Sequence, residues 1–159
     1  MAKIPFEIIQ KCINKDDFDF PTLIYDGDLR SPKGQKIYEK ALVEIKKRWF
    51  SVSDYILVKK FGFKTPEVNR SRRGFKKSVL NINEPNRPKF ISEEPEFIYD
   101  LISIRFHYIL WVNSKDPEVI KKAIEFEKAK FAGETYEFFQ NELKNKSVPE
   151  LTHFHFLIK

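Results

Sequence analysis

The fold of this chain is decided by residues 101–112, LISIRFHYILWV, where two kinds of side chain alternate. One set of alternate positions is entirely apolar or aromatic: Ile102, Ile104, Phe106, Tyr108, Leu110 and Val112. The other set begins with Ser103, Arg105 and His107 and ends with Ile109 and Trp111. Successive side chains of a strand point to opposite faces of a sheet, so this period of two predicts a strand with one face on a core.

The last residues of the chain repeat this alternation. In 151–158, LTHFHFLI, Phe154 and Phe156 alternate with His153 and His155. The pattern predicts a second strand. The connection between the two strands is long enough for parallel neighbours, or for an antiparallel pair with other strands between them.

A helix is predicted between these strands, over 117–145. Asp116 followed by Pro117 is a typical helix start, because Asp caps the first turn and proline fits the first helical position. Apolar residues then recur every three or four positions. Gly133 interrupts this stripe, which resumes at Tyr136.

Helices are also predicted in the N-terminal half, over 4–14 and 32–49. Ser31 and Pro32 form a helix start before 32–49, where apolar residues recur at helical spacing. Residues 53–61 favour helix or strand equally, because a short β-rich apolar run follows a capping serine. As a helix, this segment and 32–49 would form a helix–turn–helix.

Together these patterns predict an α+β fold. We expect residues 1–159 to form a single compact domain with a small, mostly antiparallel sheet. Its strands lie near 101–112 and 151–158, and its helices near 4–14, 32–49 and 117–145. Apolar residues make up 42% of the chain and aromatic residues 15% of it, which is sufficient for a buried core.

Positive charge is concentrated in residues 64–89. This basic segment holds eight Lys and Arg against two Glu, a net charge of +6 that equals the net charge of the whole chain. Prolines, Asn, Ser and Gly are dispersed through it, which predicts a loop-rich insertion or arm. A localised positive field concentrates polyanions at one surface.

The basic segment has the composition of a nucleic-acid-binding surface. Cations provide affinity for phosphates, short polar side chains position the backbone, and an aromatic ring stacks on an unpaired base. The candidate binding residues are Arg70, Arg72, Arg73, Phe75, Lys76, Lys77, Arg87 and Lys89. An acidic protein surface would satisfy the same charges, and the sequence does not distinguish DNA from RNA.

Three histidines and an arginine are weaker catalytic candidates. His153 and His155 share one face of their predicted strand, and His107 and Arg105 share one face of theirs. If the two strands are neighbours, these side chains converge and have the chemistry of a metal-independent phosphodiesterase or nuclease. The His-x-Thr/Ser motifs of two-histidine phosphoesterases are absent.

The remaining features indicate the cellular compartment and the origin of the protein. Cys12 is the only cysteine, so no internal disulfide framework exists and a reducing, cytoplasmic compartment is expected. The N-terminus resembles no secretory signal, and no apolar run is long enough to span a membrane. Abundant Lys, Ile, Phe and Asn with little Ala is typical of an A/T-rich genome, such as that of a phage or other virus.

The sequence therefore predicts a small intracellular protein that binds nucleic acid without catalysis. Motifs for P-loop, dinucleotide and serine-hydrolase chemistry are absent, and no cofactor or metal is expected. One alternative is a protein-interaction module or inhibitor that docks on an acidic host partner. The other is the phosphodiesterase that would use His107, His153 and His155.

Overall fold

The structure is a computed structural model, and it divides the chain into two compact units. We call residues 1–35 and 89–159 the sheet unit, and residues 36–88 the helical unit. The structure describes residues 4–5, 13–16, 21–25, 30–66, 76–97, 101–102, 105–141, 148 and 151–159. Compact units of this size occur both within domains and as domains, so the single-domain prediction stays a prediction.

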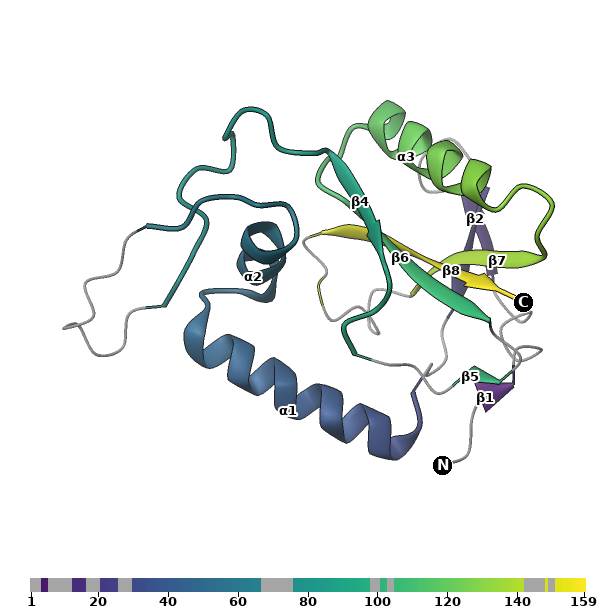
Figure 1. Cartoon of the computed structure of the whole chain (residues 1–159), viewed down its shortest axis with the longest axis horizontal. Helices are drawn as coiled ribbons and strands as arrows, with labels where there is room; N and C mark the ends of the chain where they lie inside the picture. The colour runs from purple at the N-terminus through teal and green to yellow at the C-terminus, as the bar shows by residue number, and fades with distance from the viewer. Residues whose placement is uncertain are drawn as a thin grey trace. The chain divides into compact units, whose positions relative to one another are not determined.

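Most strands of the sheet unit form one mixed sheet. Its order is β2-β3-β7-β8-β6-β4, and only the β3–β7 pair is parallel (Figure 1). These strands are β2 (Ile13–Asp16), β3 (Pro21–Tyr25), β4 (Phe90–Glu93), β6 (Phe106–Val112), β7 (Tyr136–Asn141) and β8 (Thr152–Ile158). A separate parallel pair joins β1 (Ile4–Pro5) to β5 (Leu101–Ile102).

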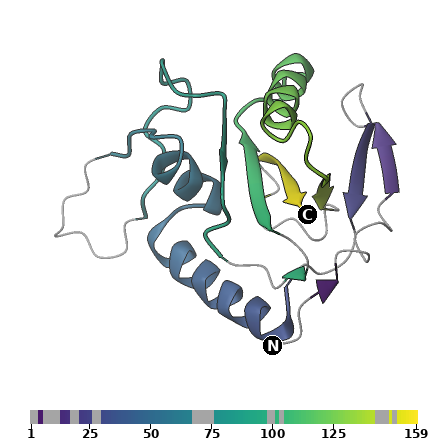
Figure 2. The same cartoon turned by 45° about the vertical axis from the view of Figure 1, so that its right-hand side comes forward.

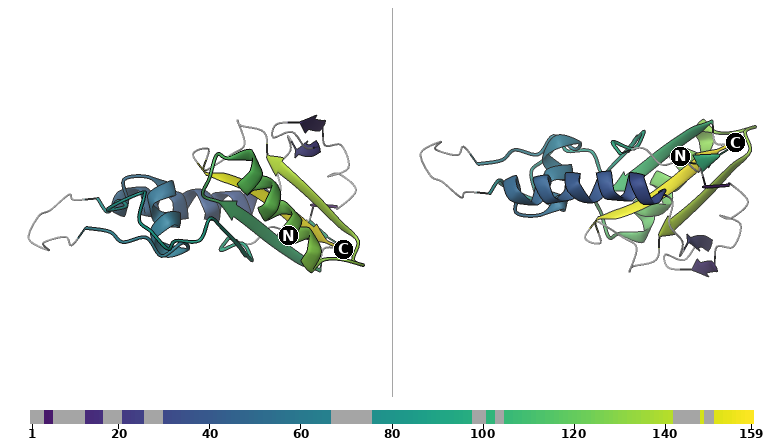
Figure 3. Two further views of the ribbon diagram at one scale, coloured as in Figure 1. Left: turned by 90° about the horizontal axis from the view of Figure 1, so that it is seen from above. Right: turned by 90° about the horizontal axis from the view of Figure 1, so that it is seen from below.

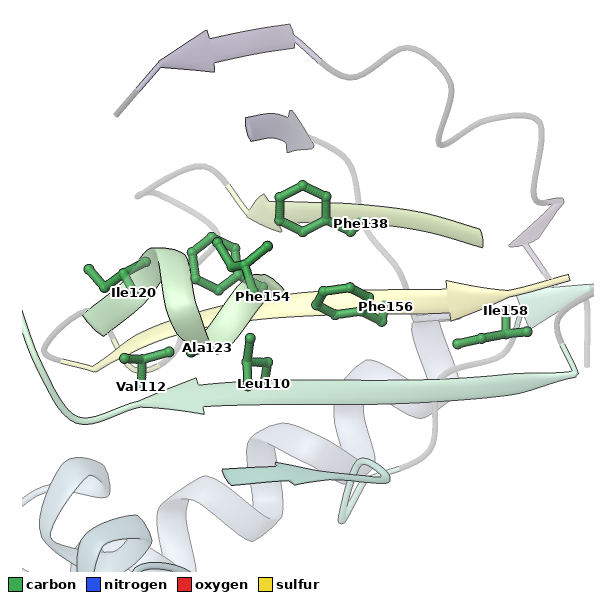
Figure 4. Packing of buried hydrophobic residues seen from close by; sticks show 9 residues of the cluster. Leu110, Val112, Ile120, Ala123, Phe138, Phe154, Phe156 and Ile158 are labelled. Atoms are coloured by element: carbon green, nitrogen blue, oxygen red, sulfur yellow. The ribbon is translucent and has the colours of Figure 1, made fainter. Parts of the chain in front are cut away.

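Helix α3 (Pro117–Lys130) covers one face of this sheet, as the two opposite views of Figure 3 show. The apolar positions of β6 and β8 meet the helix, and Ile120 and Ala123 point into the layer of phenylalanines between them (Figure 4). Phe154 and Phe156 are fully buried at its centre. The buried residues of this core are Leu110, Val112, Ile120, Ala123, Ile124, Phe138, Phe154, Phe156 and Ile158.

One charged residue of α3 is buried beside this core. Glu127 is 0% exposed, and it accepts hydrogen bonds from the Ser92 hydroxyl of β4 and from Lys130 Nζ at 2.9 Å. A buried carboxylate is costly unless such donors satisfy it.

The helical unit contains α1 (Pro32–Arg48), which begins in the sheet unit, and α2 (Val52–Lys59). Figure 2 shows α2 beside the C-terminal end of α1. Apolar residues between Trp49 and Phe63 are buried: Trp49, Val52, Ile56, Leu57, Phe61 and Phe63. The described parts of 64–88 form turns and bends, with one bridge between Lys77 and Trp49.

The predicted α+β class is confirmed, with a sheet that is mostly antiparallel. The strand over 151–158 and the helix over 32–49 are also confirmed, and 53–61 is mainly the helix α2. The strand predicted over 101–112 is present as β5 and β6, and residues 103–104 lie outside the described residues.

The helix predicted over 117–145 is wrong for residues 131–141, and residues 142–145 lie outside the described residues. The helix ends at Lys130, and Gly133 turns the chain with a φ of +85°. Residues Tyr136–Asn141 then form β7, antiparallel to β8. The aromatic spacing around Tyr136 fits a strand as well as a helix, and pairing along the free edge of β8 decides between them.

The helix predicted over 4–14 is wrong wherever the structure describes it. Ile4–Pro5 is strand β1, and Ile13–Asp16 is strand β2, antiparallel to β3. Residues 6–12 of this prediction lie outside the described residues. An isolated helix of eleven residues is marginal, so pairing with distant strands outweighs its local pattern.

Candidate functional site

The histidines lie on the sheet face opposite α3. Strands β6 and β8 are antiparallel neighbours, with Ile109 opposite His155 and Trp111 opposite His153. Because side chains alternate along each strand, His107, His153 and His155 share the face that α3 does not cover. The histidines were expected to converge only if the two strands are neighbours, and β6 and β8 are neighbours.

Two of these histidines are hydrogen-bonded to each other. His107 Nε2 lies 2.9 Å from His155 Nδ1, and their ring centroids are 5.2 Å apart. The His155 ring also stacks on Phe139 at 5.2 Å, with 14° between the planes. This pair is therefore held by ring packing as well as by its hydrogen bond.

His153 is held separately. Its Nδ1 donates to the carbonyl oxygen of Leu151 at 3.1 Å, and its ring lies 4.6 Å from that of Trp111. Arg105 does not join the cluster, since its guanidinium forms an exposed salt bridge with Glu134. In the part of the chain that the structure describes, no group of three His, Cys, Asp or Glu side chains is placed to hold a metal ion.

Burial keeps the histidine pair neutral. It lowers the pKa of His107 from 6.5 to about 3, with a smaller effect from the positive charge of Arg30. Burial also lowers the pKa of His155 well below 6.5, followed by the effects of His107, His153 and Arg30. Two neutral imidazoles fit the observed hydrogen bond, in which one ring donates and the other accepts.

This arrangement is poorly suited to acid–base catalysis on a phosphodiester. His155 is 1% exposed and His153 is 4% exposed, so a phosphate cannot touch either ring in this conformation. The mechanism also requires one protonated imidazole, which burial opposes. The phosphodiesterase hypothesis stays a prediction, and the geometry gives these rings a structural role.

The basic segment is described at its two ends. Arg70, Arg72, Arg73 and Phe75 lie outside the described residues. Lys76 and Lys77 are exposed, and Lys77 Nζ lies 5.5 Å from the centroid of the Trp49 ring.

Near the C-terminal end of the basic segment, charged side chains pair with each other. Arg87 is half-buried and pairs with Glu84, with Nη2 2.7 Å from Oε1. Glu84 also accepts a hydrogen bond from the backbone N–H of Lys64 at 2.9 Å, and this bond, with Arg87, lowers its pKa. Lys89 is exposed but belongs to the sheet unit. Of the described candidates, Lys76 and Lys77 are therefore best placed for a ligand in the helical unit.

Sequence reasoning missed a basic stripe on α1. At about 100° per residue, four exposed residues fall within about 60° of one another around the helix. We call these residues the α1 stripe: Lys36, Lys40, Val43 and Lys47. The half-buried residues Tyr38, Ala41, Leu42 and Ile45 lie on the opposite side of the helix. The lysine spacing was visible in the sequence, but only the packing identifies this side as exposed.

Charge divides between the two units. The helical unit contains fourteen Lys and Arg against five Asp and Glu, a net charge of +9. The sheet unit contains fifteen against eighteen, a net charge of −3. The positive field thus extends beyond the basic segment to the whole helical unit, including α1.

Comparisons with known proteins leave the function open. No protein-family model matches the chain, and neither does any curated protein. A solved structure, the crystal structure of HTC1, is similar over 81% of this chain and 74% of that chain, with a TM-score of 0.47 and 16% sequence identity. This similarity is too weak to support an argument about function.

None of the helices that the structure describes has both the length and the apolar character needed to cross a bilayer.

Proposed function

We propose that the helical unit binds nucleic acid by contacting its phosphate backbone. The observation that carries this proposal is the net charge of +9 within residues 36–88, beside −3 in the rest of the chain. A protein that neutralises phosphates with Lys and Arg releases condensed counterions, and this release favours binding.

The α1 stripe supplies a row of cations for this contact. From Lys36 to Lys47 the helix rises by roughly 16 Å, at about 1.5 Å per residue. Within the described ranges, Lys36 and Lys40 form no salt bridge, and Lys47 pairs only with the exposed Glu44, at 2.6 Å. An exposed pair of this kind is worth little, so Lys47 can exchange its partner for a phosphate.

The end of α1 extends this row toward the basic segment. Lys77 N donates to the carbonyl oxygen of Arg48 at 2.9 Å, so the two backbones are held together there. Arg48, Lys76 and Lys77 are all exposed. Four candidates outside the described residues, Arg70, Arg72, Arg73 and Phe75, remain part of the proposal through their sequence alone.

The N-terminus of α2 is not proposed as a recognition element. The Ser51 hydroxyl accepts a hydrogen bond from Asp54 N at 3.0 Å, and the Asp54 carboxylate occupies the first turn. A carboxylate at this position repels phosphate, so the helix–turn–helix mode of binding is not favoured.

Fluorescence anisotropy with labelled DNA and RNA, measured across a salt series, tests the proposal. We expect tight binding at low salt and a linear fall of log affinity with log salt. The double variant Lys36→Gln/Lys40→Gln should weaken binding and reduce the slope for duplex DNA by up to about 1.8, at about 0.9 for each lost phosphate contact. Arg72→Glu/Arg73→Glu should weaken binding in the same way.

The matched control is Lys121→Gln/Lys122→Gln, which removes two exposed charges from α3 in the sheet unit. It should leave both the affinity and the slope close to those of the unmodified protein. Absence of binding at low salt would exclude nucleic acid as the ligand. Affinity purification with and without nuclease would then test for an acidic protein partner.

A further inference from the structure

An exposed phenylalanine lies between α1 and α2. Phe50 is 77% exposed, more than any other large apolar side chain in the part of the chain that the structure describes. Its neighbour Trp49 is only 5% exposed. The chain therefore buries one aromatic ring at this turn and presents the next one to solvent.

The backbone fixes where Phe50 is presented. Phe50 N donates to the carbonyl oxygen of Lys77 at 2.8 Å, and Lys77 N donates to that of Arg48 at 2.9 Å. On the buried side, Lys77 Nζ lies 5.5 Å from the centroid of the Trp49 ring. These contacts hold the backbone of Phe50 next to the basic segment.

Three cationic residues lie close to Phe50 in the chain or on the segment paired with it. Arg48 precedes it by two residues, and Lys76 and Lys77 lie on the paired segment; all three are exposed. An exposed ring beside several cations is the arrangement with which proteins bind single-stranded nucleic acid. The ring stacks on a base, and the cations contact the phosphates on either side.

We propose that Phe50 stacks on an unpaired base, so that the helical unit prefers single-stranded to double-stranded nucleic acid. This inference rests on the proposed function and deepens it by naming the class of ligand. A duplex keeps its base faces stacked inside, where Phe50 cannot reach them without unpairing the strands. Charge alone would not create this preference, because a duplex has the higher charge density.

Variants of Phe50 test the inference against a short single strand and the matching duplex, using the full chain. Phe50→Ala should weaken single-strand binding about 5- to 150-fold, the range for losing one stacked base, and change duplex binding by less than about twofold. Phe50→Trp retains a stacking ring and should bind the single strand at least as well as the unmodified protein.

Phe50→Trp also provides a direct readout of stacking. The two native tryptophans, Trp49 and Trp111, are buried, so the introduced indole is the exposed one. Its fluorescence should be quenched by the single strand and not by the duplex. The matched control is Phe126→Ala, which removes an exposed ring from the sheet unit and should leave both affinities unchanged.

The two proposals fail in different ways. If the unmodified protein binds neither strand form at low salt, the proposed function is wrong, and this inference with it. If it binds both forms and Phe50→Ala binds the single strand as tightly as before, only the stacking inference is overturned. Equal losses on the single strand and the duplex would also overturn it.

Discussion

At the scale of the residue, the histidine pair shows how a polar group is tolerated inside this protein. His107 and His155 share one hydrogen bond, and Phe139 packs against the second ring. Protonation would place a charge next to another imidazole and near Arg30, in an environment that cannot solvate it. The pair therefore stabilises the fold only while both rings are neutral.

Acidification should destabilise the protein from about pH 6.5 downward. The folded-state pKa values lie below the unfolded value of about 6.5, so the unfolded state binds more protons as the pH falls. The stabilisation is fully present above this value. Between pH 7 and pH 5 the free energy of unfolding should fall by roughly 2 kcal/mol through His107, and the lowered pKa of His155 adds a loss of the same sign. Urea denaturation at several pH values measures this loss.

The control is the double variant His107→Gln/His155→Gln, which lacks both titrating groups. Its free energy of unfolding is expected to be lower at pH 7, because buried packing is lost, but to change much less between pH 7 and pH 5. Equal stability of the unmodified protein at these two pH values would contradict the argument from burial.

At the scale of the element, Asp54 connects α2 to the basic segment. Its Oδ1 accepts a hydrogen bond from Val79 N at 2.8 Å, and its Oδ2 lies 2.5 Å from the Ser51 hydroxyl. One carboxylate thus completes the start of a helix and fixes a segment twenty-five residues further along the chain. Val79 follows Lys77 by two residues, so this bond adds to the backbone hydrogen bonds that join Lys77 to Arg48 and Phe50.

Asp54→Ala should lower the free energy of unfolding by about 1–3 kcal/mol, since it leaves the Val79 N–H without its acceptor. Asp54→Asn keeps an oxygen at the same position and should recover most of this loss. The comparison is Asp116→Ala, which removes the side-chain cap of α3 and should cost about 1 kcal/mol. Urea denaturation measures these changes, provided that the slope of the unfolding free energy against urea concentration is the same for all variants. An Asp54→Ala curve equal to that of the unmodified protein would disprove the connection.

At the scale of the whole molecule, aromatic residues have two separate uses. In the sheet unit they fill the core, where Phe156 contacts the rings of Phe138 and Tyr136. In the helical unit Phe50 is left on the surface beside cations. The same residue type therefore stabilises the fold in one unit and is available to a ligand in the other.

Phe156→Ala should lower the free energy of unfolding by about 3–5 kcal/mol, because a fully buried ring is replaced by a cavity. Phe50→Ala should change it by less than about 0.5 kcal/mol, as is usual for an exposed side chain. Thermal or urea unfolding of the two variants compares these costs directly. A large cost for Phe50→Ala would mean that its ring packs in the fold and is not held for a ligand.

Helices and strands could be predicted from the sequence where the local side-chain pattern agrees with the contacts made in the folded chain. Helix α1 begins at its predicted Ser31–Pro32 start, and strands β6 and β8 follow their alternation. Strand β7 was missed because the aromatic spacing around Tyr136 satisfies a helical stripe as well. Its pairing partner β8 lies more than ten residues further along the chain, so the pattern around Tyr136 does not reveal the pairing.

Local sequence patterns are enough to predict the α+β class, the two main strands and the concentration of positive charge. These properties depend on residues close together in the chain, where side-chain period and composition act directly. Three features follow from the folded chain and not from any local pattern: His107 contacts His155, the α1 stripe is exposed, and Phe50 lies on the surface while Trp49 is buried. The reason is physical: strand register and burial depend on contacts between segments far apart in the chain, and no local period encodes those contacts.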